Sequence, residues 1–158
     1  MDIVAQICES LDHDWLPTIY IGKVRSGRTR SHHLEIPLRE NRAEIQYTLL
    51  GIELKIGKRR FACPDLATAR YMRIFARIGC RDFAVPYDIT QISGIADQLE
   101  TAWQRSVVML ENQQNRSQRS LAMDRAGLVK MMRNEIAACG AGDPMPLFDR
   151  ETKHRSTE

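Results

Sequence analysis

The sequence predicts an α+β fold, with a small, mostly antiparallel sheet of about four or five strands covered by three to four helices. Three observations lead to this class. Short segments that alternate between apolar and polar residues, or that are rich in β-branched residues, fill much of the first half of the chain. Apolar residues spaced three or four apart dominate the second half, which predicts that the C-terminal half is helical. The chain has 158 residues, 43% of them apolar, which is the size of one ordinary domain with its own core.

The first elements expected are a short helix and two strands. Residues 3–11 place their apolar side chains on one side of a helix. The stretch 12–17, which ends in Pro17, is expected to interrupt this helix. The β-branched stretch 18–24 predicts a strand, and the polar stretch 26–31 predicts a turn or loop. Residues 34–38 predict a second strand, which is an edge strand or ends at its proline.

The strongest strand signal, at residues 43–56, changes parity in its middle. Apolar residues up to Leu49 share one parity, those from Leu50 onward share the other, and Gly51 lies beside the change. A strand cannot switch its apolar residues between faces without an inserted residue, so we expect either a β-bulge at 49–51 or a break into two strands there. Gly57-Lys58 is typical of a two-residue hairpin turn, which leads into a strand at 59–63.

A helix at 64–79 is bounded by clear signals. Pro64 and Asp65 favour its start, and Gly79 favours its end. A short strand is expected at 81–85, and the order strand, helix, strand predicts a right-handed crossover between parallel neighbours.

Two longer helices complete the predicted domain. Asp88 or Thr90 caps the first, which runs to residue 110 with one continuous apolar face. After the wholly polar stretch 111–120, the second helix spans about 121–138. Residues 1–139 are thus expected to form a single domain and 140–158 a flexible tail. Within that tail, the apolar residues 145–148 either dock on the domain or form a motif for a partner.

Positive charge is concentrated in two segments, although the net charge of the chain is only +3. Residues 23–30 carry four cations and no acid, and residues 55–81 carry eight cations and one acid. Such basic fields attract phosphate, which predicts nucleic-acid or other polyanion binding through a face formed by both segments. The residues expected to form this face are Lys23, Arg25, Arg28, Arg30, Lys58, Arg59, Arg60, Arg70, Arg73 and Arg77.

The arginines at 70, 73 and 77 form a stripe on the predicted helix 64–79, apart from its apolar stripe. We expect all three to be exposed together, on the side of the helix away from the core. The alternative is a solvated face that pairs in part with the acidic helices of the same chain.

Two other classes of function fit the sequence. One is an interaction or assembly module, including a homodimer, that uses the amphipathic helices within 91–136; the simpler interpretation of these helices is packing on the protein's own sheet. The other is a metal-dependent nuclease, because Glu53 and Lys55 share one face of a strand. The Glu53 carboxylate could then hold Mg²⁺ beside Lys55, which would position a water or phosphate.

The strand with Glu53 and Lys55, followed by a helix and another strand, resembles in outline the nucleases of the PD-(D/E)xK class. The resemblance covers about a quarter of the chain. It implies an upstream aspartate on a neighbouring strand, but no aspartate lies between Asp14 and Asp65, so Glu35 or Glu44 would have to replace it. Mg²⁺ would be the cofactor in that case, and no cofactor is expected otherwise.

The remaining candidate residues favour simpler roles. His32 and His33 are adjacent, so on a strand they point to opposite faces and cannot chelate one metal together. The four cysteines follow no framework, and the chain start lacks the features of a signal peptide, so we expect reduced thiols and a cytoplasmic protein. No apolar run approaches the roughly 20 residues that a membrane helix needs, so we expect no membrane partner. Cys63 and Cys80 flank the basic helix and are either buried and inert or activated by the nearby arginines.

Overall fold

The computed structural model describes residues 2–113 and 116–141, which form two small antiparallel sheets and five α-helices. This confirms the predicted α+β class. The helices are α1 (Ile3–Leu11), α2 (Leu16–Ile19), α3 (Leu66–Ile78), α4 (Ile92–Glu111) and α5 (Gln118–Cys139). The strands are β1 (Thr29–His33), β2 (Ala43–Thr48), β3 (Gly51–Ile56), β4 (Arg59–Cys63) and β5 (Asp82–Pro86).

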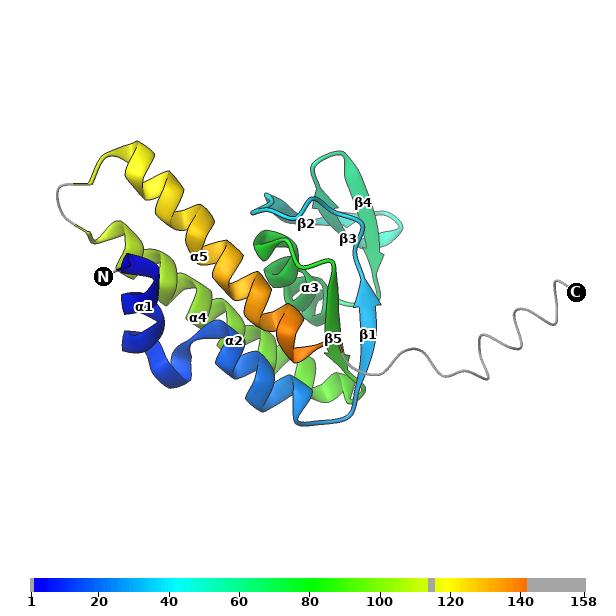
Figure 1. The fold of residues 1–158 in the computed structure, drawn as a ribbon. Coiled ribbons are helices and arrows are strands. Elements are labelled where there is room, and N and C mark those ends of the chain that lie inside the picture. The colour runs from blue at the N-terminus through cyan, green and yellow to red at the C-terminus, as the bar shows by residue number, and fades with distance from the viewer. Residues whose placement is uncertain (1, 114–115, 142–158) are drawn as a thin grey trace, which may run out of the picture.

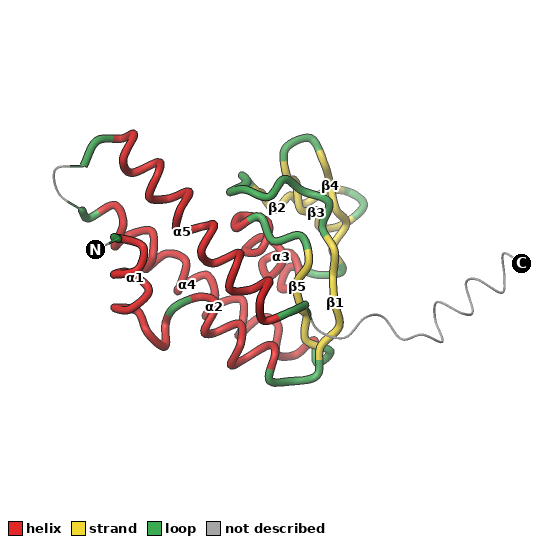
Figure 2. Tube along the Cα trace, in the orientation of Figure 1, coloured by secondary structure: helices red, strands yellow, loops and turns green. Residues whose placement is uncertain are grey.

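The helices gather on one side of the molecule and the strands on the other, with α3 between them (Figures 1 and 2). The two sheets are a β2-β3-β4 meander and a β1-β5 pair. One face of α3 packs against β2 and β3, and another packs against α4. This central position explains why seven of the thirteen residues of α3 are buried, so the helix has little solvent-facing surface.

The ends of α3 form as its sequence predicts. The Asp65 carboxylate accepts a hydrogen bond from the Thr68 backbone N–H at 2.7 Å, which satisfies one of the free donors of the first turn. Gly79 ends the helix with a φ of +82°, and a Cβ there would lie 2.4 Å from the carbonyl oxygen of Arg39. Both the backbone conformation and the close approach of residue 39 therefore require glycine.

The strand 43–56 breaks where its parity changes. β2 ends at Thr48, Leu49 and Leu50 form the turn, and β3 begins at Gly51, so the prediction of a break is confirmed. In the next hairpin, Ile56 pairs with Arg59 across the turn at Gly57 and Lys58, as predicted. Leu49 and Leu50 are fully exposed at the β2–β3 turn, which lies at the opposite end of the meander from Lys58.

The prediction of a strand at 18–24 is wrong, because this segment is helical. It continues from α2 into a π-helical stretch, Tyr20–Arg25. Leu16, Tyr20 and Val24 are buried, whereas Thr18 and Gly22, which a strand would turn to the same face, are exposed. Burial of every fourth residue overrides the β propensity of the stretch.

Residues 34–38 do not form the expected strand, although Leu34 and Ile36 are buried and Glu35 between them is exposed. The Leu34 N–H donates to the Arg81 carbonyl at 2.7 Å, and Arg81 Nε donates to the Ile36 carbonyl at 2.5 Å. These two hydrogen bonds to Arg81 take the place of the hydrogen bonds that a neighbouring strand would make. The strand in this region is β1, part of which was expected to be a turn.

The predicted parallel crossover is also wrong. β5 follows α3 but joins the other sheet, where it pairs antiparallel with β1, for example Ser31 with Ala84. Antiparallel strands do not need a crossover helix between them, as parallel neighbours do. Helix α3 therefore connects the two sheets rather than two strands of one sheet.

The apolar faces of α4 and α5 pack inside the protein. The buried side chains of α4 include Leu99 and Trp103, and those of α5 include Leu128 and Met132. Of the predicted tail, the structure describes Gly140 and Ala141; the rest of the tail, including the apolar residues 145–148, lies outside the described residues. No helix within the described ranges is long and apolar enough to cross a membrane.

Candidate functional site

The three arginines of α3 face α4 rather than solvent. Arg70 forms ion pairs with Asp97 and Glu100, the latter at 3.0 Å, and Arg73 pairs with Glu100 at 3.1 Å. The expectation that Arg70, Arg73 and Arg77 are exposed together is therefore wrong. Because α4 packs along α3, acids spaced three apart on α4 lie opposite arginines spaced three apart on α3.

The α3–α4 ion pairs are partly shielded from solvent, which strengthens them. The side chains of Arg70, Arg73 and Glu100 are 21%, 23% and 26% exposed. Burial raises the pKa of Glu100, but the hydrogen bonds from Arg70 and Arg73 outweigh it and hold this pKa below its ordinary value. The same contacts raise the pKa of Arg70. Glu100 is thus kept ionised and joins both arginines to α4.

Arg77, one turn further along α3, differs from its two neighbours. Its guanidinium is half-buried and makes no hydrogen bond or ion pair with any side chain in the described part of the protein. Burial lowers its pKa, and the adjacent positive charge of Arg73 lowers it further. The Nε of Arg73 is also buried without a hydrogen-bond partner among the described residues. The guanidiniums of Arg77 and Arg73 therefore both carry N–H donors that have no acceptor within the described protein.

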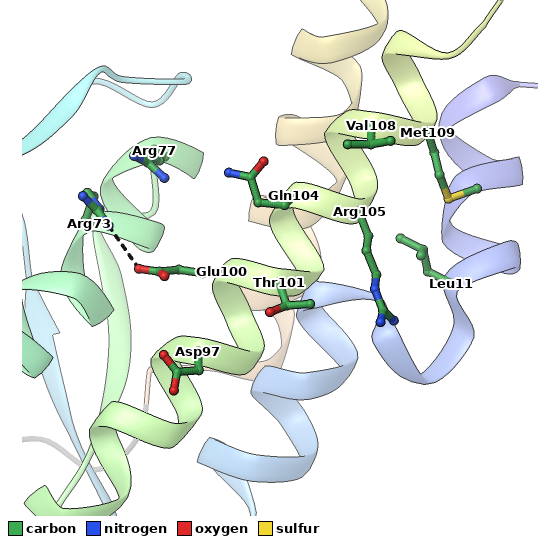
Figure 3. Close-up of a pocket in the computed structure, with 10 residues that line it drawn as sticks. All are labelled: Leu11, Arg73, Arg77, Asp97, Glu100, Thr101, Gln104, Arg105, Val108 and Met109. Carbon is green, nitrogen blue, oxygen red and sulfur yellow. Dashed lines mark hydrogen bonds and ion pairs between the residues drawn. The ribbon is translucent and has the colours of Figure 1, made fainter.

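Arg73 and Arg77 line a groove of about 780 Å³ between α3, α4 and α1. Figure 3 shows Arg77 on α3 and Gln104 on α4 extending toward the same space, with the Arg73–Glu100 pair below them. Further along α4, the wall becomes apolar and consists of Val108 and Met109, with Leu11 of α1 opposite. The groove thus has one cationic end and one apolar end.

A second hollow of about 740 Å³ lies on the other side of Arg77 and Gln104, which line both. Its charged residues include Glu40 and Arg125, which are bound to each other at 2.7 Å, while the Arg125 guanidinium stacks 5.5 Å from the Trp103 ring centre. The negative charge of Glu40 is therefore already balanced by Arg125.

The basic residues of the β3–β4 hairpin, in contrast, lie on the surface. Lys58, Arg59 and Arg60 are exposed, and Lys55 lies behind them on β3, between Glu44 and Arg60 in the sheet register. In the described structure, no side-chain hydrogen bond or ion pair is made by Lys55, Lys58 or Arg59. Arg60 approaches the mostly buried Glu53 carboxylate at 3.8 Å, so it is the hairpin cation that has an acidic neighbour.

The other basic segment, 23–30, lies far from this hairpin. Figure 1 shows the β3–β4 turn and the loop before β1 at opposite ends of the molecule. Lys23 and Arg30 are exposed, whereas Arg25 donates to the Cys139 carbonyl at 3.4 Å and to Thr29 at 3.2 Å. Arg28 stacks over the Tyr87 ring at 5.3 Å. The structure therefore separates the residues of the predicted basic face into three locations.

Glu53 and Lys55 lie on β3, but the structure does not gather the partners that a metal site would need. Glu44 lies opposite Lys55 rather than Glu53, and the Glu35 carboxylate contacts His33 at 3.0 Å. β5, which completes the order of the nuclease-like elements, belongs to the other sheet. Among the described residues, no group of three or more His, Cys, Asp or Glu side chains could hold a metal ion.

The thiols flanking α3 have the properties of buried residues rather than of nucleophiles. Burial raises the pKa of Cys63, and it raises the pKa of Cys80 to about 12 against the weaker opposing effect of Arg133. His32 packs against Phe83 with ring centres 5.5 Å apart, while His33 contacts Asp82 at 2.7 Å. The two histidines therefore have separate partners, as their adjacency predicts.

Sequence reasoning missed the groove, although part of its signal was present. Asp97 and Glu100 lie outside the apolar face of the helix 92–110, with the same three-residue spacing as Arg70 and Arg73. The alternative expectation, that the arginine stripe pairs in part with acidic helices of the same chain, is therefore confirmed for Arg70 and Arg73. Nothing in the sequence indicates that Arg77 lacks an acidic partner, because this depends on which residue of α4 lies opposite it.

Comparison with protein-family profiles, with curated proteins and with solved structures gives no match to this chain. The function must therefore be argued from the geometry of the chain itself.

Proposed function

We propose that the protein binds nucleic acid, or another polyanion, through the β3–β4 hairpin. The observation that carries this proposal is the exposure of Lys58, Arg59 and Arg60 at and after the β3–β4 turn, with Lys55 opposite Arg60 in the sheet register. Lys58 and Arg59 can bind phosphate without breaking any hydrogen bond or ion pair within the described protein. A two-stranded ribbon of this kind fits the major groove of duplex DNA.

The proposed contact surface is smaller than the basic face expected from the sequence. Arg70 and Arg73 are left out because a phosphate would have to displace Glu100 from both of them. Lys23, Arg28 and Arg30 are exposed in the other basic segment, apart from the hairpin. No group of acidic or histidine side chains in the described residues supports the Glu53–Lys55 nuclease hypothesis.

Binding should be measured by fluorescence titration of labelled duplex and single-stranded oligonucleotides at several salt concentrations. The variant Lys58→Gln/Arg59→Gln/Arg60→Gln should lower affinity and reduce the slope of log K against log salt by about 2 to 3, or about 0.9 per lost phosphate contact. The control is Arg119→Gln/Lys130→Gln, which removes two exposed cations of α5. The control should bind as the unmodified protein does.

Three results would contradict the proposal. Oligonucleotides could fail to bind at about 50 mM salt, where phosphate contacts are strongest. The hairpin variant could bind as tightly as the control. A third variant, Lys23→Gln/Arg28→Gln/Arg30→Gln, could account for the whole salt slope, which would move the surface to the other end of the molecule.

The proposal includes a cytoplasmic location and a homodimer. All four cysteines are free, which suits a reducing compartment. A dimer formed through the helices within 91–136 would present two hairpins to one duplex. However, most apolar side chains of α4 are buried in the core, and Val108 is the large one that stays well exposed there. Sedimentation velocity at high protein concentration tests the dimer, and a monomer would remove this part of the proposal.

A further inference from the structure

The groove between α3, α4 and α1 has the composition of a binding site for a small amphipathic anion. Its volume of about 780 Å³ lies within the range of roughly 300–1,000 Å³ typical of small-molecule sites. One end presents the guanidiniums of Arg73 and Arg77, and the other presents the side chains of Leu11, Val108 and Met109. The hairpin proposed to bind nucleic acid does not line this groove, so the two proposals are independent.

The charges in the groove leave one cation unbalanced. Asp97 is paired with Arg70, and Glu100 with both Arg70 and Arg73. Arg105 is held by Asp14 at 2.5 Å. Arg77 alone among the charged groups lining the described groove has no ion-pair partner. This balance favours a ligand with a single negative charge.

The unused donors indicate which head group fits. Arginine presents its N–H groups as a planar fork, which matches the two oxygens of a carboxylate. The Gln104 amide extends from α4 toward the same space as Arg77 and can donate a third hydrogen bond (Figure 3). A phosphate monoester fits less well, because its second charge would face Asp97 and Glu100 in the same groove.

We propose that this groove binds an organic carboxylate with an apolar body, with the carboxylate held by Arg77 and Gln104 and the body lying against Val108, Met109 and Leu11. Burial of the body adds affinity in proportion to its apolar area, so the carboxylate alone should bind weakly. The apolar body alone should also bind weakly, since it leaves the Arg77 donors without an acceptor.

Isothermal titration calorimetry with four probes tests the proposal: octanoate, acetate, 1-octanol and octyl phosphate. Octanoate should bind one per chain, at least about tenfold more tightly than acetate or 1-octanol. It should also bind more tightly than octyl phosphate. Absence of octanoate binding, binding of several molecules per chain, or tighter binding of octyl phosphate would overturn the proposal.

Variants then locate the site. Arg77→Met should weaken octanoate binding by at least about tenfold, since it removes a charged hydrogen-bond donor, whereas Lys130→Met on the exposed face of α5 should have no effect. Val108→Ser should weaken octanoate but not acetate. Equal binding of octanoate by Arg77→Met and the unmodified protein would overturn the proposal.

A final variant separates loss of the site from loss of the fold. Gln104→Glu has nearly the same shape but gives Arg77 a carboxylate of the chain's own. It should therefore keep or raise the melting temperature while weakening octanoate binding at least about tenfold. A variant that keeps both its melting temperature and its octanoate affinity would show that Arg77 does not hold the ligand.

Discussion

The β3–β4 hairpin and helix α3 are both rich in arginine, and the fold uses their charges differently. On the hairpin, Lys58 and Arg59 face solvent without an ion-pair partner among the described residues. On α3, Arg70 and Arg73 are three-quarters buried against α4, where Glu100 binds both. The comparison teaches that a basic run indicates a surface for a partner only where the fold brings no acidic helix against it.

The largest effect that would sharpen this comparison is expected from Glu100→Gln. The change removes the carboxylate that both arginines share, so we expect a loss of about 1–3 kcal/mol in the free energy of unfolding. Urea denaturation measures it. The control is Glu111→Gln, because Glu111 is 62% exposed and lies 3.9 Å from Arg125; it should change the stability by less than about 0.5 kcal/mol. Equal effects would mean that burial of the α3–α4 pairs adds nothing.

A second comparison uses the same substitution in both regions. Arg73→Met leaves one oxygen of Glu100 without its donor and should cost about 1 kcal/mol of stability. Arg59→Met breaks no side-chain hydrogen bond or ion pair within the described residues and should stay within about 0.5 kcal/mol. If Arg59→Met were the more destabilising of the two, the hairpin cation would be structural and the contrast would fail.

A third test uses acid. The folded pKa of Glu100 lies below its ordinary value, so its pairing stabilises the protein above about pH 4.5, the ordinary pKa, and is lost as the pH falls through the folded value. The unfolding free energy, measured from pH 6 to pH 3, should therefore fall less in Glu100→Gln than in the unmodified protein. Parallel curves for the two proteins would contradict this role of Glu100.

The smallest effect is expected at His33, an exposed counterpart of the α3–α4 pairs. Its hydrogen bonds to Glu35 and Asp82 raise its pKa. The stabilisation is thus fully present below about pH 6.5, the ordinary histidine pKa, and is lost as the pH rises through the folded value, opposite in direction to Glu100. An NMR titration should show the pKa of His33 falling in Glu35→Gln, with little change in stability because the ring is 55% exposed. A pKa unchanged by this substitution would show that Glu35 has no influence.

The sequence predicted those elements whose signals are local. Gly79, Gly57 and the parity change beside Gly51 each mark a backbone event that depends on neighbouring residues, and each lies where predicted. The segment 18–24 was mispredicted because its β-branched residues favour a strand, whereas its contacts with α4 and α5 select a helix.

The site was less predictable than the fold. The cations of the hairpin and of α3 were identified from composition, but which of them stay free depends on the packing of α4 against α3. That packing is set by contacts between residues about thirty positions apart, such as Arg70 and Glu100. The groove itself depends on the side chain opposite Arg77, which no local pattern reveals.

The hydroxyl of Tyr20 joins three parts of the chain that are far apart in sequence. It accepts a hydrogen bond from the Ala84 N–H at 2.8 Å and donates one to the Gly140 carbonyl at 2.8 Å, in a position where the ring is fully buried. A chain emerging from the ribosome therefore cannot complete the surroundings of Tyr20 until residue 140 has been synthesised. Closing a loop of 120 residues is an entropic cost that must be met before the contact forms, which slows folding. Until then the surfaces of α1 and α2 that pack against α5 stay uncovered.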